Sequence, residues 1–147
     1  PIFWIYPNAD LGYRKILLVI EDWRDDGRIT PLGNVDRRDY LTLLANARLL
    51  VGNSSSGILE APSFHTPVVN IGNRQRGRMQ ASNVLNCGHG PEDVAQAIGR
   101  ALSDADFLAR AAASENPYGD GQSGRRICEI LECIEINREL LDKETTY

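Results

Sequence analysis

The sequence is poor in several features, and each shortage excludes a class of protein. Only three of its 147 residues are cysteines, and Cys87, Cys128 and Cys133 lack CxxC spacing, which argues against a disulfide framework and a zinc site. No apolar run approaches the roughly 20 residues of a membrane-spanning helix, so we expect no membrane association. The formal net charge of −4 provides no positive field for nucleic acid.

What is present suits one cytoplasmic domain over residues 1–147, because this length is typical of a single hydrophobic core. The chain begins at Pro1 rather than at a methionine, and its apolar start PIFWIYP lacks the basic region of a signal peptide. We therefore expect a piece of a longer protein from a reducing compartment. The three cysteines are expected to be small buried or half-buried residues.

Strand and helix patterns alternate along the chain. Asp10 and Asp36 are placed to cap the first two helices, and Pro62 predicts that the third helix is irregular or begins near this proline. Short apolar runs predict buried strands at 1–7, 48–52 and 66–72, the first with Phe3, Trp4 and Tyr6 in the core, and a short strand is expected at 28–32. Helical spacing predicts helices at 11–23, 36–47, 58–64, 91–102 and about 123–141. This order favours an α/β, Rossmann-like fold with a parallel sheet, whose ligands bind at the carboxyl ends of the strands.

The strongest local signal is the segment Gly52-Asn53-Ser54-Ser55-Ser56-Gly57, between a predicted strand and a helix. Small residues let backbone N–H groups approach an anion, the positive end of the helix adds attraction, and the serine hydroxyls add donors. The letters match neither GxGxxG nor the Walker pattern. A tight turn capped by a serine is the alternative, so the loop alone leaves anion binding open.

Two further segments carry groups that could bind part of a ligand. Glu60 follows the serine segment, where a carboxylate can accept hydrogen bonds from a ribose diol or can simply be a solvated residue. Arg74, Arg76 and Arg78 follow the strand at 66–72, where guanidinium groups can bind phosphate. A solvated basic loop and nucleic-acid binding are the alternatives. Arg74 is nearest the strand end and is our choice for a ligand contact.

The remaining candidates are weaker. Asn8 and Val35 occupy comparable strand-end positions, but each has an ordinary role available, in a turn or in apolar packing. His65 and His89 have no partners at metal-ligand spacing, and His65 in SFHTP is typical of a turn residue rather than a base. The sequence therefore predicts no metal site and no cofactor.

Taken together, the motifs resemble those of the UDP-N-acetylglucosamine 2-epimerases, in particular the hydrolysing branch that feeds sialic-acid-type sugar synthesis. The resemblance rests on GNSSSGILEAPSFHTPVVNIGNRQRGR, ASNV, NPYGDGQSGRRI and YPNADLG, and it extends from about Tyr6 to Ile134. The non-hydrolysing branch typically has SGGxQEE where this chain has SSSGILE.

The resemblance implies the C-terminal half of a two-domain, glycosyltransferase-B-like fold that binds UDP or a UDP-N-acetylhexosamine. It implies that Ser54 and Ser55, with the turn at Gly57, bind the diphosphate and that Arg74 contacts the phosphates. It further implies that Glu60 holds the ribose. Asn8 would lie near the diphosphate and sugar, and the backbone around Val35 would face the uracil.

In the family a base removes the sugar C2 proton, UDP leaves by elimination, and water adds to release N-acetylmannosamine. The proton-transfer residues belong to the N-terminal half and to a histidine segment preceding this chain, so we assign no catalytic residue here. We expect the 147-residue chain alone to be inactive and, with an apolar cleft face uncovered, to self-associate as a homo-oligomer. A UDP-sugar glycosyltransferase domain and a non-catalytic nucleotide-binding module are the alternatives.

Overall fold

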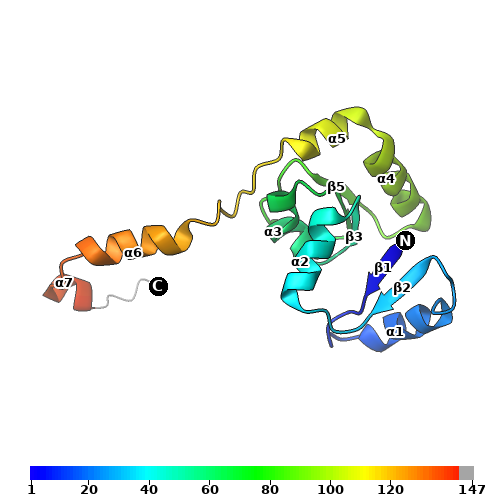
Figure 1. Ribbon diagram of the computed structural model, residues 1–147, viewed down its shortest axis with the longest axis horizontal. Helices are drawn as coiled ribbons and strands as arrows, with labels where there is room; N and C mark the ends of the chain where they lie inside the picture. The colour runs from blue at the N-terminus through cyan, green and yellow to red at the C-terminus, as the bar shows by residue number, and fades with distance from the viewer. Residues whose placement is uncertain (143–147) are drawn as a thin grey trace. The chain divides into compact units, whose positions relative to one another are not determined.

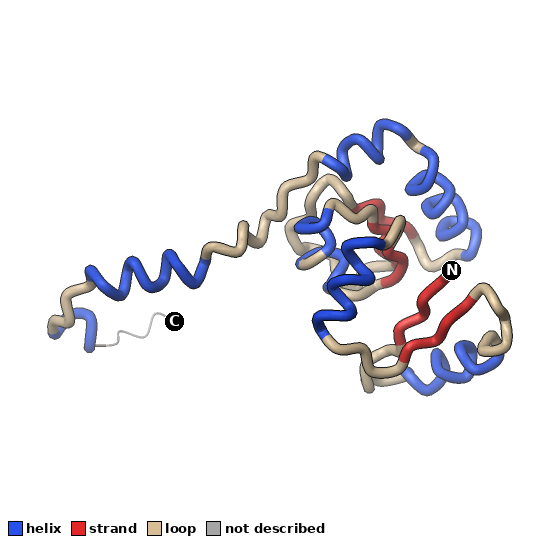
Figure 2. The backbone as a smooth tube through the Cα atoms, in the orientation of Figure 1, coloured by secondary structure: helices blue, strands red, loops and turns tan. Residues whose placement is uncertain are grey.

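The computed structural model describes residues 1–142 and divides into two compact units, residues 1–47 and the part of the chain from Arg48 onward (Figure 1). Within each unit every paired strand of the described residues runs parallel to its neighbour. The predicted α/β class with parallel strands is confirmed. Strands and helices alternate as far as β4 (Val68–Ile71), which is followed by β5 (Val84–Cys87) with only a loop between them (Figure 2).

The first unit contains a two-stranded sheet and two helices. Strand β1 (Ile2–Ile5) pairs in parallel with β2 (Ile29–Leu32). Helix α1 (Tyr13–Asp22) connects these strands, and α2 (Arg37–Asn46) follows β2. The apolar residues of this unit that are fully buried are Ile20 of α1 and Leu44 of α2, at 0% and 2% exposure.

Two expectations for this unit differ from the structure. The first strand is not buried, since Ile2 and Phe3 are 57% and 49% exposed on a sheet of only two strands. Asp10 is not the cap of α1, because the helix begins after Gly12, whose left-handed backbone (φ 92°) starts the turn. Asp36 does cap α2, and its carboxylate accepts a hydrogen bond of 2.8 Å from the Arg38 N–H.

The second unit is built on a three-stranded parallel sheet in the order β3–β4–β5. These strands are β3 (Leu50–Gly52), β4 (Val68–Ile71) and β5 (Val84–Cys87). Strand β4 is central, and Val68, Val69 and Asn70 are each at most 2% exposed. The strand at 66–72 is therefore buried as predicted, whereas β5 was not predicted.

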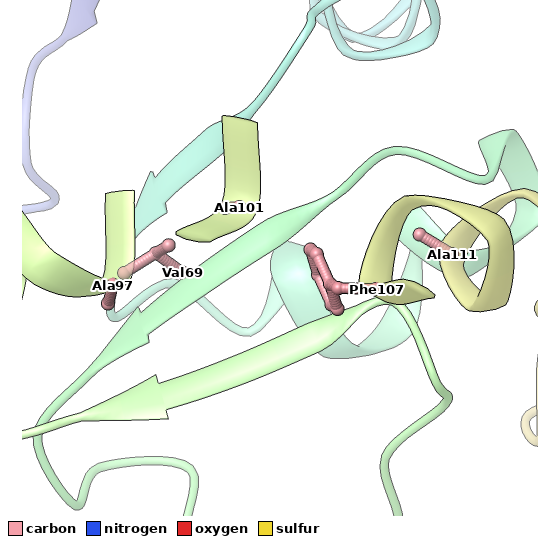
Figure 3. Close-up of a cluster of buried hydrophobic side chains, with 5 residues drawn as sticks. All are labelled: Val69, Ala97, Ala101, Phe107 and Ala111. Atoms are coloured by element: carbon pink, nitrogen blue, oxygen red, sulfur yellow. The ribbon is translucent and has the colours of Figure 1, made fainter. Parts of the chain in front are cut away.

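Helices cover both faces of this sheet. Helix α3 (Ser56–Leu59) and the 3₁₀ turn η1 (Ala61–Phe64) follow β3, and α4 (Pro91–Ser103) and α5 (Ala105–Ala112) follow β5. The neighbouring residues Val68 and Val69 point to opposite faces of the sheet. Val68 lies against Gly57 of α3, where an added Cβ would be 2.9 Å from Val68 Cγ1. Val69 belongs to a buried hydrophobic cluster whose other members are Ala97, Ala101, Phe107 and Ala111 (Figure 3).

The predicted final helix is divided into two in the structure. Helix α6 (Ser123–Cys133) ends at Ile134, whose backbone is extended, and α7 (Arg138–Leu141) begins after Asn137. The Asn137 side chain accepts a hydrogen bond from the Leu140 N–H, so it starts a new helix instead of continuing the old one. No residue of α6 is buried. Cys128 and Cys133 are exposed, contrary to expectation, while Cys87 is half-buried.

Candidate functional site

Two polar loops begin at neighbouring strand ends in the second unit. The serine loop, residues 53–55, follows β3, and the arginine loop, residues 73–78, follows β4. The pairing of Gly52 with Asn70 aligns the carboxyl ends of these parallel strands. Both loops therefore emerge at one edge of the sheet, where open α/β sheets bind ligands.

The serine loop is folded by hydrogen bonds from the helix that follows it. The Ser56 N–H donates to Ser54 Oγ at 3.3 Å, and the Ile58 and Leu59 N–H groups donate to the Ser55 carbonyl at 3.0 and 2.9 Å. Ser55 is the N-cap residue of α3, but within the described chain its hydroxyl makes no capping hydrogen bond. The Ser54 hydroxyl instead accepts the Ser56 N–H, so the alternative of a turn stabilised by a serine also fits this geometry.

The helix after the serine loop is shorter than the sequence suggested. Helix α3 has four residues and gives way to η1 at Ala61, one residue before Pro62. So short a helix aligns few peptide dipoles, and the attraction expected from its positive end is correspondingly small. Anion binding at this loop therefore depends on hydroxyl, backbone and guanidinium donors.

Glu60 lies at the corner between α3 and η1. Its carboxylate accepts a hydrogen bond of 2.6 Å from the Ser56 hydroxyl, one helical turn earlier. The residue is half-buried, in contrast to the solvated glutamate of the alternative interpretation. A carboxylate has about four acceptor positions, so one carboxylate can accept hydrogen bonds from several donors at once.

The arginine loop contacts the serine loop through the carbonyl oxygen of Asn53. Gln75 Nε2 donates to this oxygen at 2.8 Å, and Arg74 Nη1 donates to it at 3.3 Å. The structure thus brings Arg74 next to the serine loop, twenty-one residues away in the sequence. Arg76 and Arg78 are exposed in the same loop and add positive charge to this edge of the sheet.

Gly72 fixes the direction in which the arginine loop leaves β4. Its backbone has φ 74°, which favours glycine, and an added Cβ would collide with the His89 imidazole. His89 follows β5, so the ends of β4 and β5 lie close together here. His65 is the C-cap of η1 with φ 56°, which confirms the prediction of a turn residue.

The candidate residues are divided between the two units. Ser54, Ser55, Gly57, Glu60 and Arg74 form one group in the second unit. Asn8 is exposed in the segment after β1, and Val35 is half-buried just before the Asp36 cap of α2. Both belong to the first unit, so they are not members of the group described above.

Three functional candidates were missed by sequence reasoning. Gln75 is 2% exposed, and its Oε1 is buried without a partner among the described residues. Its position between two arginines marked it as part of a solvated loop, and only the fold shows it buried. Asn116 and Tyr118, in the NPYGDG motif, bond to residues of the α3–η1 corner and of the segment after the arginine loop. The motif itself was the available signal.

Other chemistries find less support at this edge. In residues 1–142, no group of three or more His, Cys, Asp or Glu side chains is arranged to hold a metal ion. Burial, and secondarily the Asp93 carboxylate, raises the pKa of the Cys87 thiol above its ordinary value. A protonated thiol is a poor nucleophile, so Cys87 is not poised for covalent chemistry. No helix of the described chain has the length and apolarity to span a membrane.

Comparison with solved structures places the fold in the glycosyltransferase-B-like class. The crystal structure of UDP-GlcNAc 2-epimerase from Neisseria meningitidis bound to UDP-GlcNAc superposes with a TM-score of 0.67 at 19% identity. The match covers 89% of this chain and 36% of that one. Similarity at this level of identity defines the fold.

The particular family follows from the sequence. The chain belongs to the UDP-N-acetylglucosamine 2-epimerase family, whose model matches residues 1–132. It is 32% identical over 146 residues to UDP-N,N'-diacetylbacillosamine 2-epimerase (hydrolyzing) of Legionella pneumophila, covering 99% of this chain. It is 37% identical over 81 residues to GDP/UDP-N,N'-diacetylbacillosamine 2-epimerase (hydrolyzing) of Campylobacter jejuni, covering 54% of this chain and 21% of that relative. The chain spans 37% of the length of the Legionella relative.

Proposed function

We propose that this chain is the UDP-binding part of a hydrolysing UDP-N-acetylglucosamine 2-epimerase. The observation that carries the proposal is the shared Asn53 carbonyl, which holds Arg74 beside the serine loop. Hydroxyl donors and a guanidinium group on one sheet edge are complementary to a diphosphate. The half-buried Glu60 carboxylate, at the end of the helix that follows, adds an acceptor for a ribose hydroxyl.

Each residue then has a distinct role. Ser54 and Ser55 donate to the diphosphate, and Arg74 neutralises its charge. Gly57 lets α3 approach β4 closely enough to hold the serine loop at the strand end. Glu60 accepts from the ribose, and the roles that the resemblance implies for Asn8 and Val35 stay predictions.

Calorimetric titration of the 147-residue chain with UDP tests this proposal. We expect a saturable heat of binding. The affinity for UDP should fall by about 10- to 100-fold in Arg74→Ala, because a hydrogen bond to a charged group is worth about 1.5–3 kcal/mol. Arg76→Ala is the matched control, since it removes the same charge from the same loop and should change affinity by less than about threefold. Absence of heat at millimolar UDP would refute the proposal, as would equal losses in the two variants.

The reaction of the whole protein is tested on its products. We propose that the protein converts UDP-N-acetylglucosamine to N-acetylmannosamine and UDP, by elimination of UDP and addition of water. The hydrolysing names of the Legionella and Campylobacter relatives support release of a free sugar. Those names also specify a diacetamido sugar, so both UDP-sugars are assayed in parallel. Transfer to an acceptor, or an epimerised sugar still linked to UDP, would contradict the proposed reaction.

A further inference from the structure

The NPYGDG motif lies against the corner that carries Glu60. Asn116 Nδ2 donates hydrogen bonds to the Leu59 carbonyl at 3.0 Å and to Ser63 Oγ at 2.7 Å. Its Oδ1 accepts from the Tyr118 N–H at 2.9 Å, so both functional groups of this amide are used. Leu59 ends α3 and Ser63 lies within η1. Asn116 therefore bonds to the backbone just before Glu60 and to a side chain just after it, from 53 to 57 positions further along the chain.

The same motif also contacts the segment that continues from the arginine loop. The Tyr118 hydroxyl donates to the Met79 carbonyl at 3.0 Å, one residue after Arg78. Within three residues the chain is thus bonded to the corner at Glu60 and to the end of the arginine loop. Neither contact is needed to extend a helix or a strand, since residues 116–118 belong to neither.

We propose that residues 116–118 form a strap that positions the nucleotide site, with Asn116 orienting Glu60 toward the ribose and Tyr118 orienting the arginine loop toward the diphosphate. This inference rests on the proposed function. Asn116 and Tyr118 are positioning residues, because each acts through the backbone of another segment. A carboxylate discriminates a hydroxyl from its absence only when its direction is fixed, and the Asn116 bonds fix the corner from which Glu60 projects.

The strap makes a different prediction for each end of the ligand. UDP, 2′-deoxy-UDP and uridine are titrated into the 147-residue chain and its variants. Asn116→Ala should reduce the preference for UDP over 2′-deoxy-UDP by about threefold or more, while affinity for 2′-deoxy-UDP stays within about twofold. Tyr118→Phe, which removes one hydroxyl, should reduce the preference for UDP over uridine by about threefold and leave the 2′-hydroxyl preference unchanged.

Coupling to Glu60 provides the decisive control. Glu60→Gln should remove most of the 2′-hydroxyl preference, and adding Asn116→Ala to Glu60→Gln should then change that preference no further. Should Asn116→Ala fail to fold, Ser63→Ala removes one acceptor of the Asn116 amide and should shift the same ratio in the same direction. A merely structural Asn116 would weaken all ligands equally and leave the ratio intact.

The outcomes separate this inference from the function on which it rests. If the unmodified chain binds no UDP, both fail. If it binds UDP but Asn116→Ala leaves the ratio unchanged, or its effect adds fully to that of Glu60→Gln, the strap proposal alone is overturned. A loss of the 2′-hydroxyl preference in Tyr118→Phe would also overturn the proposal that Asn116 acts on the ribose end of the ligand and Tyr118 on the diphosphate end.

Discussion

The two sheets of this molecule begin from similar sequences and end in different environments. Strand β4 lies between two neighbours with helices on both faces, and Val68 and Val69 are 2% and 0% exposed. Strand β1 has one neighbour in its unit, and Ile2 and Phe3 are about half exposed. An apolar run thus establishes that a strand forms, while the number of neighbouring strands and covering helices decides how deeply it is buried.

The same difference separates the candidate binding residues. The covered sheet carries the serine loop, Glu60 and Arg74. Arg74 donates to the Asn53 carbonyl of the serine loop, and Glu60 accepts from Ser56, the residue directly after that loop. The first unit carries Asn8 and Val35, for which the resemblance supplied almost all of the argument. Residues on a well-packed scaffold are held in a fixed geometry, which is what recognition of a charged ligand requires.

The largest test of this contrast removes the same side chain from each unit. Phe107→Ala should cost about 3–5 kcal/mol in the free energy of unfolding, because Phe107 is 1% exposed in the core under β4. Phe3→Ala should cost less than about 1.5 kcal/mol, since its ring is already half in water. Urea titrations of the two variants measure both values. Equal losses would show that the first unit is covered in solution.

A smaller test adds a methyl group at a glycine in each unit. Gly57→Ala should lower the free energy of unfolding by about 1–2 kcal/mol. The new Cβ would be 2.9 Å from Val68 Cγ1, and the restricted χ1 of valine prevents this side chain from rotating away. In Gly33→Ala, the described atoms leave the new Cβ without a neighbour within 4 Å. The free energy of unfolding of Gly33→Ala should be unchanged or should rise by up to about 1 kcal/mol. Thermal unfolding distinguishes them, and tolerance of Gly57→Ala would contradict the close contact.

A third test concerns the buried link between the two loops. Gln75→Leu removes the hydrogen bond to the Asn53 carbonyl and also removes the unpartnered Oε1, so stability should change by less than about 1 kcal/mol. The loosened serine loop should weaken UDP binding by about three- to tenfold. Gln96→Leu, the same change at an exposed position of α4, is the control and should leave UDP binding unchanged. Unchanged affinity in Gln75→Leu would show that the link is unnecessary.

The smallest effect is expected at the surface of the first unit. Hydrogen bonds from Arg24 and Tyr6 lower the pKa of Glu21 from 4.5 to about 2. This contribution to stability is complete above about pH 4.5 and is lost as pH falls toward 2, because protonation then breaks the contacts. The difference in Tm between the unmodified chain and Glu21→Gln should therefore be small at pH 6 and vanish near pH 2. A difference in Tm that grows as the pH is lowered would contradict this role of the Glu21 carboxylate.

Much of the second unit was predictable because its signals are local. Pro91 at the first turn and the helical spacing after it predicted α4, and the bounds Pro91–Ser103 confirm it. Strand β5 was missed because it is four residues long and contains polar Asn86, which contacts Asn70 of β4 through its side chain. The asparagine is explained by that cross-strand contact, which no window of sequence contains. Helix α5 was missed as well, although its buried residues Phe107 and Ala111 are at helical spacing.

The site was predictable to the same extent. Small residues and arginines after buried strands indicated the two loops, because strand ends converge in a parallel sheet. The shared Asn53 carbonyl, the burial of Gln75 and the contacts of Asn116 were not predictable, since each joins segments twenty or more residues apart. The division of the final helix at Ile134 was missed because periodicity across it continues while the backbone does not.

The three-stranded sheet also bears on how the chain folds. Leu50 of β3 pairs with Val68, eighteen positions later, and Val68 pairs with Val84, sixteen positions further on. In the other sheet, Ile2 pairs with the more distant Ile29. Short loops close with a smaller entropy loss, and low contact order goes with rapid folding. We therefore expect β4 to gain its amide protection first in pulse-labelled hydrogen exchange. The sheet edge from which the serine and arginine loops emerge would then form early in folding, because it is built around the central strand β4.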